Sequence, residues 1–494
     1  MKDDIYDIAI IGGGINGMGI ARDAAGRGLS VLLLEKSDFA SATSSASTKL
    51  IHGGLRYLEY YEFGLVRAAL KEREVLLDMA PHIIWPLEFI LPHSRDMRPA
   101  WLIRLGLFLY DHLGGRKKLP ASKMVKLNAD KIKPRYRKGF SYADCWVDDA
   151  RMVILNAIDA REHGADIYNY TPCEGATCED GLWHLTAGGA LRGKALKARQ
   201  LVNAAGPWVR EFLDGNDLAE AKTHKIRLVK GSHIITKRLF DGDECYILQQ
   251  ADGRIVFIIP YEDEFSLIGT TDVEYQGDPA AVTIEDSEVD YLCRAVNLYI
   301  NAEISPKDVV ASYSGVRPLL DSGEDNASAV TRDYVLERSD AAGAPLLSIF
   351  GGKITTYRAL AEKALSGLTA RAPWTKDSIL PGGLDGVVEG AKLAPHIQKL
   401  CPELDEDGCA SLAKRWARQY GSRAHILIDV SLKAEGGCGI NFGCGLYQAE
   451  VDYLMREEFA VTADDILWRR TKLGLHFTDA QRIALENYIK TVKA

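Results

Sequence analysis

The chain of 494 residues is 47% hydrophobic, 26% charged and 9% aromatic, a composition that excludes a largely disordered protein. Its length is several times the usual domain of roughly 150 residues, so we expect two or three packed units. A net charge of −8 argues against a general nucleic-acid binder. The nine cysteines include no Cys-x-x-Cys pair, so we expect reduced thiols in a cytoplasmic compartment and no metal site.

The sequence shows neither a signal peptide nor a membrane-spanning segment. Its first apolar run, Ile8–Ile11, is short and leads directly into glycines. No uncharged apolar stretch reaches the length of about 18 residues that a spanning helix needs. Peripheral attachment to a membrane surface stays open on these grounds.

The N-terminal segment has the pattern of a strand, a helix and a second strand. Tyr6–Ile11 is an apolar run typical of a buried parallel strand. Met18–Arg27 has helical spacing with small residues suited to packing on a sheet, and Ser30–Leu34 predicts a second buried strand.

A glycine motif joins this first strand to the helix. Gly12, Gly14 and Gly17 form Gly-x-Gly-x-x-Gly, and Glu35 stands at the end of the second strand. Such glycines permit a tight turn, close approach of a pyrophosphate and close packing of helix on strand. The helix N-terminus attracts phosphate, and the carboxylate accepts hydrogen bonds from ribose hydroxyls. The motif therefore predicts a dinucleotide site, and Glu35 disfavours NADP.

The next segment favours FAD over a nicotinamide cofactor. Thr43–Lys49 is a hydroxyl-rich run that leads into Ile51–Tyr57. A flavin dinucleotide needs this extra length of contact for its second phosphate and ribityl chain. The alternative is a serine-rich surface loop.

The strands of the nucleotide domain lie far apart in the chain, so we predict a discontinuous domain. Leu201–Ala205 and Pro345–Phe350 are further short buried strands, and helical patterns dominate after a Pro- and Gly-containing linker at 373–383. The predicted boundaries are 1–80, 140–215 and 330–375 for the FAD-binding domain, 81–139 and 216–329 for an inserted substrate domain, and 384–494 for a C-terminal helical domain.

Blocks spread along the chain jointly resemble the FAD-dependent glycerol-3-phosphate dehydrogenase family, and most closely its bacterial aerobic respiratory branch. These blocks are Gly12–Glu35, Ser44–Tyr57, Asp144–Arg151, Val202–Trp208, Ile268–Asp272, Tyr313–Leu319 and Phe350–Arg358. The resemblance covers essentially the whole chain. Related oxidases that use oxygen share much of it. The anaerobic branch is expected to carry C-terminal cysteine chemistry that Cys438 and Cys444 do not resemble.

The resemblance implies an α/β fold with a C-terminal all-α domain, in which an antiparallel sheet roofs the substrate domain over a Rossmann-like FAD domain. It implies non-covalent FAD and oxidation of sn-glycerol 3-phosphate to dihydroxyacetone phosphate, with hydride passing from C2 to flavin N5. Electrons would go to ubiquinone or menaquinone. The alternatives are a soluble oxidase that uses oxygen and a flavin-binding scaffold without turnover. The oligomeric state stays open, a homodimer included.

Cationic and basic side chains are the candidate catalytic residues. A guanidinium binds phosphate in two-pronged fashion, so Arg317 is the first phosphate candidate and Arg332 the second. His52 and His233 are the candidate bases, because imidazole accepts protons near neutral pH. Lys353 follows a glycine pair, where it would contact either flavin or substrate.

The complete set of candidates adds the residues to which the resemblance gives a role, among them Cys173, whose backbone would meet the adenine. The catalytic candidates are His52, Arg56, His233, Arg317 and Lys353. The substrate candidates are Tyr57, Thr271, Arg317 and Arg332. The cofactor candidates are Gly12, Gly14, Asn16, Gly17, Glu35, Thr43, Ser44, Ser47, Lys49, Leu50, His52, Cys173, Ala205, Gly206, Gly315, Gly352, Lys353, Ile354 and Thr355.

One apolar segment, Pro99–Tyr110, is followed by the basic cluster Gly115–Lys118. It is too short to span a bilayer, so it is either a buried core helix or a monotopic anchor. As an anchor, its aromatic residues would enter the headgroup boundary while the basic cluster meets anionic lipid. The anchor interpretation predicts a peripheral protein on the cytoplasmic face of the inner membrane, where quinone reaches the flavin from the lipid.

Overall fold

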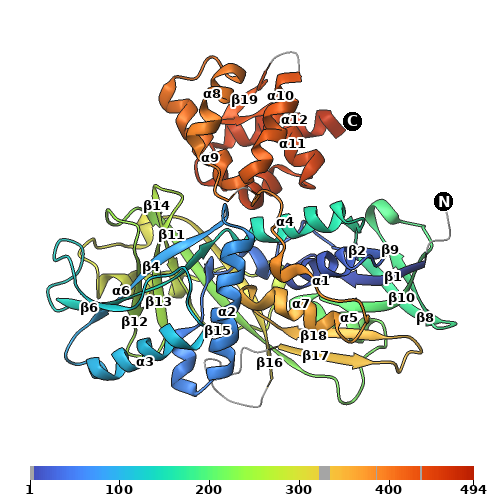
Figure 1. The fold of residues 1–494 in the computed structure, drawn as a ribbon, viewed down its shortest axis with the longest axis horizontal. Coiled ribbons are helices and arrows are strands. Elements are labelled where there is room, and N and C mark those ends of the chain that lie inside the picture. The colour runs from blue at the N-terminus through green and yellow to red at the C-terminus, as the bar shows by residue number, and fades with distance from the viewer. Residues whose placement is uncertain (1–4, 322–333, 385, 434–436, 494) are drawn as a thin grey trace.

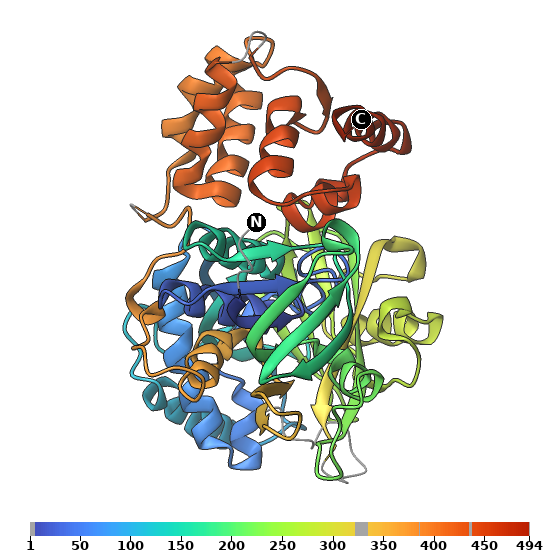
Figure 2. The same cartoon turned by 90° about the vertical axis from the view of Figure 1, so that its right-hand side faces the viewer.

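The computed structural model describes residues 5–321, 334–384, 386–433 and 437–493. Two sheets lie side by side in a large body, and a separate group of helices stands against one end of it (Figures 1 and 2). Arg332, a predicted substrate residue, lies outside the described residues.

The first sheet is the predicted Rossmann-like one. Its strand order is β17-β18-β10-β1-β2-β7, with the hairpin β8–β9 attached to β10. Strands β18, β10, β1, β2 and β7 run parallel. The strands are β1 (Ile5–Ile11), β2 (Val31–Leu34), β7 (Asp166–Tyr168), β8 (Cys173–Glu179), β9 (Leu182–Ala187), β10 (Leu196–Asn203), β17 (Tyr334–Ser339) and β18 (Leu346–Gly351).

Helices α1 (Ile15–Gly26), α4 (Asp149–Glu162) and α7 (Tyr357–Leu365) pack together with this sheet in one apolar core. Helix α1 begins three residues before the predicted Met18. The helix can start this early because Gly14 directly precedes it and Gly17 lies in its first turn, so no bulky side chain blocks the turn. The predicted strands Tyr6–Ile11 and Ser30–Leu34 are confirmed within one residue.

The second sheet has the order β15-β11-β14-β13-β12-β4-β6-β3, with β16 paired to β11 and β5 to β6. We expected an antiparallel sheet, but it is mixed, because β12 runs parallel to β4 after the chain has passed through the first sheet. The strands are β3 (Leu50–Ile51), β4 (Ile84–His93), β5 (Lys123–Lys126), β6 (Lys138–Val147), β11 (Ile226–Lys237), β12 (Cys245–Gln249), β13 (Ile255–Tyr261), β14 (Phe265–Gly269), β15 (Val273–Glu274) and β16 (Val309–Leu320).

Helices α2 (Phe63–Met79), α3 (Ala100–Leu113), α5 (Val209–Gly215) and α6 (Asp286–Asn297) complete the body. Most of strand β6 lies in the predicted FAD-binding segment 140–215, yet it pairs in the second sheet. Within the described ranges, the structure has no helix with both the length and the apolar character needed to cross a bilayer.

The C-terminal part forms its own apolar core around Trp416 and Tyr453. Its helices are α8 (Gly390–Leu400), α9 (Glu406–Tyr420), α10 (Ala424–Lys433), α11 (Gln448–Glu457), the π-helix η10 (Asp465–Arg470) and α12 (Asp479–Lys493), with a small hairpin of β19 (Asn441–Gly443) and β20 (Leu446–Tyr447). Cys401 and Cys438 form a disulfide in this part. The expectation of reduced thiols is wrong for this pair, which the separation of 37 residues had concealed.

Candidate active site

The glycine motif packs against the end of β10. A Cβ on Gly12, whose φ is +111°, would lie 2.5 Å from the Ala204 carbonyl oxygen. A Cβ on Gly17 would lie 1.9 Å from the carbonyl oxygen of Gly12 itself. Neither position tolerates a side chain, so backbone alone forms this turn and the N-terminus of α1. Ser44 reaches that N-terminus, where its Oγ accepts a hydrogen bond from the Ile15 amide at 3.0 Å.

Glu35 lies beside the glycine turn at the end of β2. Its Oε2 accepts from the Gly13 amide at 2.7 Å, and its Oε1 accepts from the Ser37 amide at 2.8 Å. Burial raises the pKa of this carboxyl above its ordinary value. The carboxylate thus sits where the motif predicts the ribose of a dinucleotide.

Asn16 joins the first turn of α1 to the end of β18. Its Nδ2 donates to the Gly351 carbonyl at 3.1 Å, and a Cβ on Gly352 would lie 2.8 Å from the same nitrogen. Among the described residues nothing donates to the buried Asn16 Oδ1. An unsatisfied buried acceptor beside glycines without room for side chains fits a ligand with hydroxyl or amide donors, as FAD has.

The hydroxyl-rich run is tied to strand β16 and to helix α4. Thr43 Oγ1 donates to the Val316 carbonyl at 2.6 Å. Ser47 Oγ and Lys49 Nζ both donate to the Asp149 carboxylate at 2.7 Å, and Leu50 then begins the buried strand β3. These contacts fix the path of the run beside the glycine turn.

Arg317 projects from β16 on the substrate side. Its Nη1 donates to Asp272 Oδ1 at 2.5 Å and its Nη2 to Thr270 Oγ1 at 3.1 Å, while 24% of the side chain stays exposed. On the neighbouring strand β11, a Cβ on Gly231 would lie 2.4 Å from the Arg317 Nη2. These contacts give the guanidinium a fixed place beside β11.

His233 lies on β11 and is fully buried. Its ring stacks on Tyr313 with centroids 4.8 Å apart, and its Nε2 lies 3.0 Å from Thr48 Oγ1. Its Nδ1 has no hydrogen-bond partner among the described residues. Burial, followed by the charges of Arg317 and Lys49, holds the pKa of His233 well below its ordinary value. The imidazole is therefore held in its neutral form, and the same burial and charges oppose its protonation.

His52 lies on the loop after β3, opposite the start of α7. Its amide donates to Thr355 Oγ1 at 3.4 Å, and Thr355 belongs with Ile354 to the 3₁₀ turn that leads into α7. Lys353 Nζ stands 4.0 Å from the Tyr57 ring, a cation–π contact. Two loops far apart in the sequence thus bring four predicted residues together: His52, Tyr57, Lys353 and Thr355.

Other predicted residues lie at the edges of this region. Arg56 extends toward the Tyr60 hydroxyl at 3.5 Å, at an exposed position. Thr271 is buried behind the site, where its hydroxyl donates to Glu288 Oε1 at 2.7 Å. Cys173 is half-buried at the start of β8, and its thiol contacts the Gly175 carbonyl.

The predicted residues Ala205, Gly206 and Gly315 lie where other backbone segments pass close to the glycine turn or to the hydroxyl-rich run. Ala205 and Gly206 follow β10, and Gly206 has a left-handed φ of +57°. A Cβ on Gly315 would lie 2.7 Å from the Ala46 Cβ, so strand β16 passes directly beneath the hydroxyl-rich run.

Sequence reasoning missed the partners of these residues. Asp272 and Asp149 lie inside matched blocks, but nothing in their spacing shows that they bind Arg317 and Lys49. Tyr110 was assigned to the apolar segment, yet its hydroxyl accepts from the Gly53 amide at 2.8 Å and donates to Asp144 Oδ2 at 2.7 Å. Such pairs join distant segments and become visible only in the folded chain.

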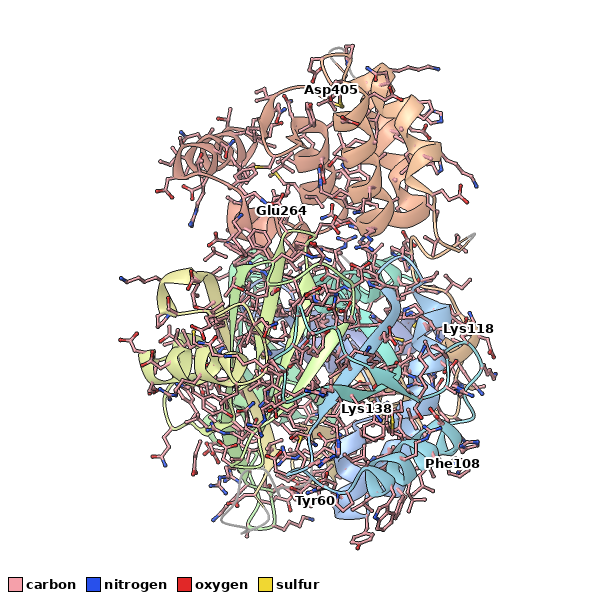
Figure 3. The ribbon with its side chains drawn as sticks, turned by 90° about the vertical axis from the view of Figure 1, so that its left-hand side faces the viewer. Tyr60, Phe108, Lys118, Lys138, Glu264 and Asp405 are labelled. Atoms are coloured by element: carbon pink, nitrogen blue, oxygen red, sulfur yellow. A yellow bond between two sulfur atoms is a disulfide. The ribbon has the colours of Figure 1, made fainter. Side chains whose placement is uncertain are left out.

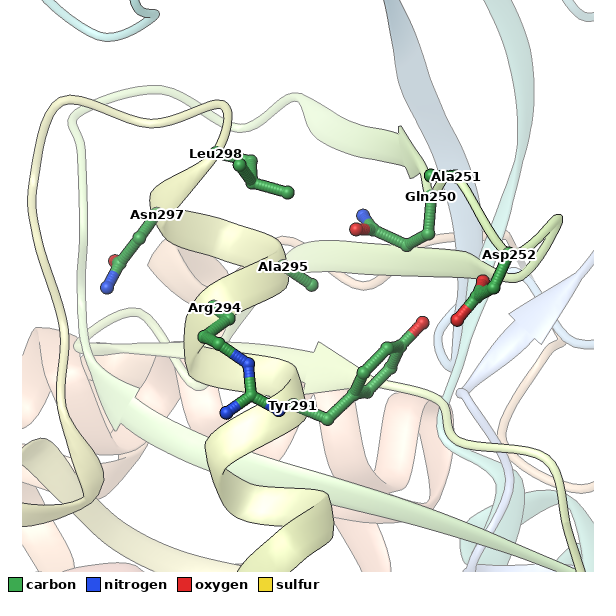
Figure 4. A pocket seen from close by; sticks show the side chains of 8 residues that line it. All are labelled: Gln250, Ala251, Asp252, Tyr291, Arg294, Ala295, Asn297 and Leu298. Atoms are coloured by element: carbon green, nitrogen blue, oxygen red, sulfur yellow. The ribbon is translucent and has the colours of Figure 1, made fainter.

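A separate open pocket of about 500 Å³ lies between α6 and the turn that joins β12 to β13 (Figure 4). The Tyr291 hydroxyl of α6 points toward Asp252 of the turn, and Arg294 and Gln250 also line the pocket. It contains none of the predicted site residues, so it is not part of the candidate active site.

Comparisons with known proteins identify the family of the chain. Residues 7–358 match the family model "FAD dependent oxidoreductase", and residues 374–494 match "C-terminal domain of alpha-glycerophosphate oxidase". The structure resembles that of the glycerol-3-phosphate dehydrogenase from Bacillus halodurans complexed with FAD. The TM-score is 0.75 with 25% identity, covering 99% of this chain and 95% of that one. The fold class and the FAD cofactor predicted from the sequence are thereby confirmed.

Curated relatives extend over nearly the whole chain. Glycerol-3-phosphate dehydrogenase from Pseudomonas aeruginosa is 52% identical over 99% of this chain and 96% of its own. The aerobic glycerol-3-phosphate dehydrogenase of Escherichia coli and the D-erythritol 1-phosphate dehydrogenase of Brucella abortus are each 50% identical over 98% of this chain and 97% of their own. The chain belongs to the FAD-dependent glycerol-3-phosphate dehydrogenase family.

Proposed function

We propose that this protein oxidises the C2 hydroxyl of sn-glycerol 3-phosphate to give dihydroxyacetone phosphate and passes the electrons to a membrane quinone. The observation that carries the first part is the near-full-length identity to glycerol-3-phosphate dehydrogenases, at 52%, 51% and 50%. FAD is held without a covalent bond in this proposal. When bound, it supplies the two-electron acceptor for the hydride that leaves C2.

The chain's own residues must hold a phosphate dianion and accept the hydroxyl proton. Arg317 suits the first task, because its planar guanidinium is fixed by Asp272 and Thr270 and a planar guanidinium matches the geometry of a phosphate. Lys353, held over Tyr57, supplies a second cation on the side of α7. Thr271 acts behind the site, where its bond to Glu288 holds the loop that carries Asp272.

His233 is the proposed proton acceptor. It is neutral because it is buried beside Arg317 and Lys49, and a neutral imidazole can take the C2 hydroxyl proton as the hydride departs. His52 is the alternative base, on the opposite loop. In the proposal it contacts the flavin side of the site, since its amide is bound to Thr355.

Arg317→Lys tests the phosphate site. Lysine keeps the charge but not the two-pronged geometry, and a charge-assisted hydrogen bond is worth about 1.5–3 kcal/mol. We expect FAD to be retained while kcat/KM for sn-glycerol 3-phosphate falls about tenfold or more. Steady-state kinetics together with the flavin content measure both. Kinetics close to those of the parent protein would remove Arg317 from the substrate site.

The pH dependence of kcat tests the base. The pKa of His233 lies well below the ordinary value of about 6.5, so its proton-accepting form persists as pH falls through that value. We expect a flat profile at pH 6.5 and above, with the acidic limb at lower pH, and a loss of about a hundredfold or more in His233→Gln. An acidic limb at or above pH 6.5 that disappears in His52→Gln would transfer the role to His52.

D-Erythritol 1-phosphate is the second candidate substrate, since one relative named for it is 50% identical to this chain. Both compounds offer a phosphate and a secondary hydroxyl, but the erythritol compound is one carbon longer. Anaerobic bleaching of the flavin by each compound, with glycerol as the control without phosphate, compares them directly. We expect the higher kcat/KM with sn-glycerol 3-phosphate. A higher value with D-erythritol 1-phosphate would reassign the substrate.

Helix α3 supports the membrane part of the proposal. All of α3 is described, and of its residues just Leu107 and Tyr110 are buried, which contradicts the core-helix alternative. Trp101 is 69% and Phe108 is 52% exposed. The neighbouring turn η2 (Leu55–Tyr60) adds exposed Tyr60, and both Tyr60 and Phe108 lie toward the end of the body away from the C-terminal helices (Figure 3). The exposed basic cluster Gly115–Lys118 follows α3 directly.

Vesicles test this surface. Exposed aromatic rings enter the headgroup boundary, and basic residues are attracted to anionic lipid. We expect salt-sensitive binding to vesicles that contain anionic lipid, weakened by Trp101→Glu with Phe108→Glu. The control is Ile483→Glu with Val492→Glu, which adds the same charge at two exposed apolar sites on α12. After anaerobic reduction, a quinone analogue should restore the flavin colour faster than oxygen. Equal rates without vesicle binding would favour the oxygen-using oxidase.

A further inference from the structure

The segment that follows Glu35 holds the glycine turn in place. We call residues 35–41 the Glu35 segment. Glu35 accepts from the Gly13 amide at 2.7 Å, and the Ala40 amide donates to the Gly13 carbonyl at 3.2 Å. The Phe39 ring packs so closely on Gly13 that a Cβ there would lie 2.7 Å from it. A displacement of the Glu35 segment would therefore displace the turn that holds the dinucleotide.

The C-terminal part binds the Glu35 segment through a buried cluster of charged side chains. Arg470 donates to both oxygens of Asp38, at 2.5 and 2.9 Å, and Arg469 Nε donates to Oδ2 at 2.5 Å. The side chain of Asp38 is 1% exposed and that of Arg470 is 0% exposed. Burial would raise the pKa of Asp38, but the two guanidinium groups hold it below its ordinary value. The carboxylate is ionised and bound from two sides.

A π-helix brings both arginines to one carboxylate. Arg469 and Arg470 are consecutive residues at the end of η10, whose wider turn is a geometry often found at functional sites. The first residue of η10, Asp465, accepts from the Tyr170 hydroxyl at 2.7 Å. The Tyr170 amide in turn donates to the Ser37 carbonyl at 2.9 Å, so the same π-helix reaches the Glu35 segment by a second route.

An aromatic contact adds a third connection. Phe459 lies between α11 and η10, and its ring meets the Phe39 ring edge to face at 5.3 Å. Phe39 is the residue that packs on Gly13. Charge, hydrogen bonds and ring packing from the C-terminal part thus converge on the Glu35 segment.

We propose that the C-terminal helical domain is a clamp for FAD: Arg469 and Arg470 hold Asp38, and thereby position Glu35 and the glycine turn around the adenosine half of the cofactor. These arginines are positioning residues, since they contact the Glu35 segment and act through it. The proposal rests on FAD as the cofactor and is independent of which polyol phosphate is oxidised.

Arg469→Gln and Asp38→Asn test the clamp. Arg469 is the milder change, because its side chain is 16% exposed and Arg470 remains on Asp38. The comparison variant is Lys414→Gln, which breaks a different and more exposed pair between the C-terminal part and the body. Lys414 binds Asp263 at 2.5 Å on the hairpin between β13 and β14, away from the Glu35 segment. All variants are made in the full chain and compared by far-UV circular dichroism and cooperative melting.

The readout is FAD binding without substrate. We expect the dissociation constant for FAD to rise about tenfold or more in Arg469→Gln and in Asp38→Asn, and less than about twofold in Lys414→Gln. The stabilisation that FAD adds to the melting temperature should shrink in the first two variants. Activity at saturating FAD should return toward the parent value, which separates this result from a failure of the proposed reaction.

A structural role alone predicts a different pattern. It would lower the melting temperatures of the FAD-free and FAD-loaded forms equally and leave the FAD dissociation constant unchanged. That result in folded Arg469→Gln would overturn the clamp, even if Asp38→Asn fails to fold.

Discussion

The close packing of the glycine turn on the end of β10 is the constraint on which the rest of the structure depends. Gly12 and Gly17 have no space for a Cβ, because the Ala204 and Gly12 carbonyls occupy it. Asn16 then ties the same turn to the end of β18. The glycine turn and the ends of β10 and β18 are distant in the chain and must meet at one point. The Rossmann-like sheet is therefore assembled from separate segments, and most strands of the substrate sheet come from the residues between those segments.

The substrate sheet contributes charges whose positions are coupled. Arg317 on β16 and His233 on β11 come from strands paired in antiparallel register. The cation suited to a phosphate therefore also helps to keep the imidazole neutral. In the proposed reaction, a bound phosphate dianion offsets the charge of Arg317 and raises the proton affinity of His233. Substrate binding and base strength are then linked through the guanidinium of Arg317. Its Nη1 is held by the Asp272 carboxylate.

Local patterns predicted much of this molecule. The glycine motif with Glu35 indicated the dinucleotide turn, and the apolar runs indicated the central parallel strands, because both signals lie within a few residues. The parallel pairing of β4 with β12, the Cys401–Cys438 disulfide and the Asp38 cluster were missed. Each joins positions that no local pattern connects. Of the candidate site, residue types were predictable, whereas their partners Asp272, Asp149 and Tyr110 depend on the folded arrangement.

The central claim is that the C2 hydrogen of sn-glycerol 3-phosphate leaves as hydride while Arg317 holds the phosphate. Its most direct test is the anaerobic rate of flavin bleaching with substrate carrying deuterium at C2, measured in a single turnover beside the protium compound. Bleaching should be several-fold slower with deuterium when the compound is saturating. Bleaching that occurs at the same rate with both compounds, or that fails with both, would contradict it.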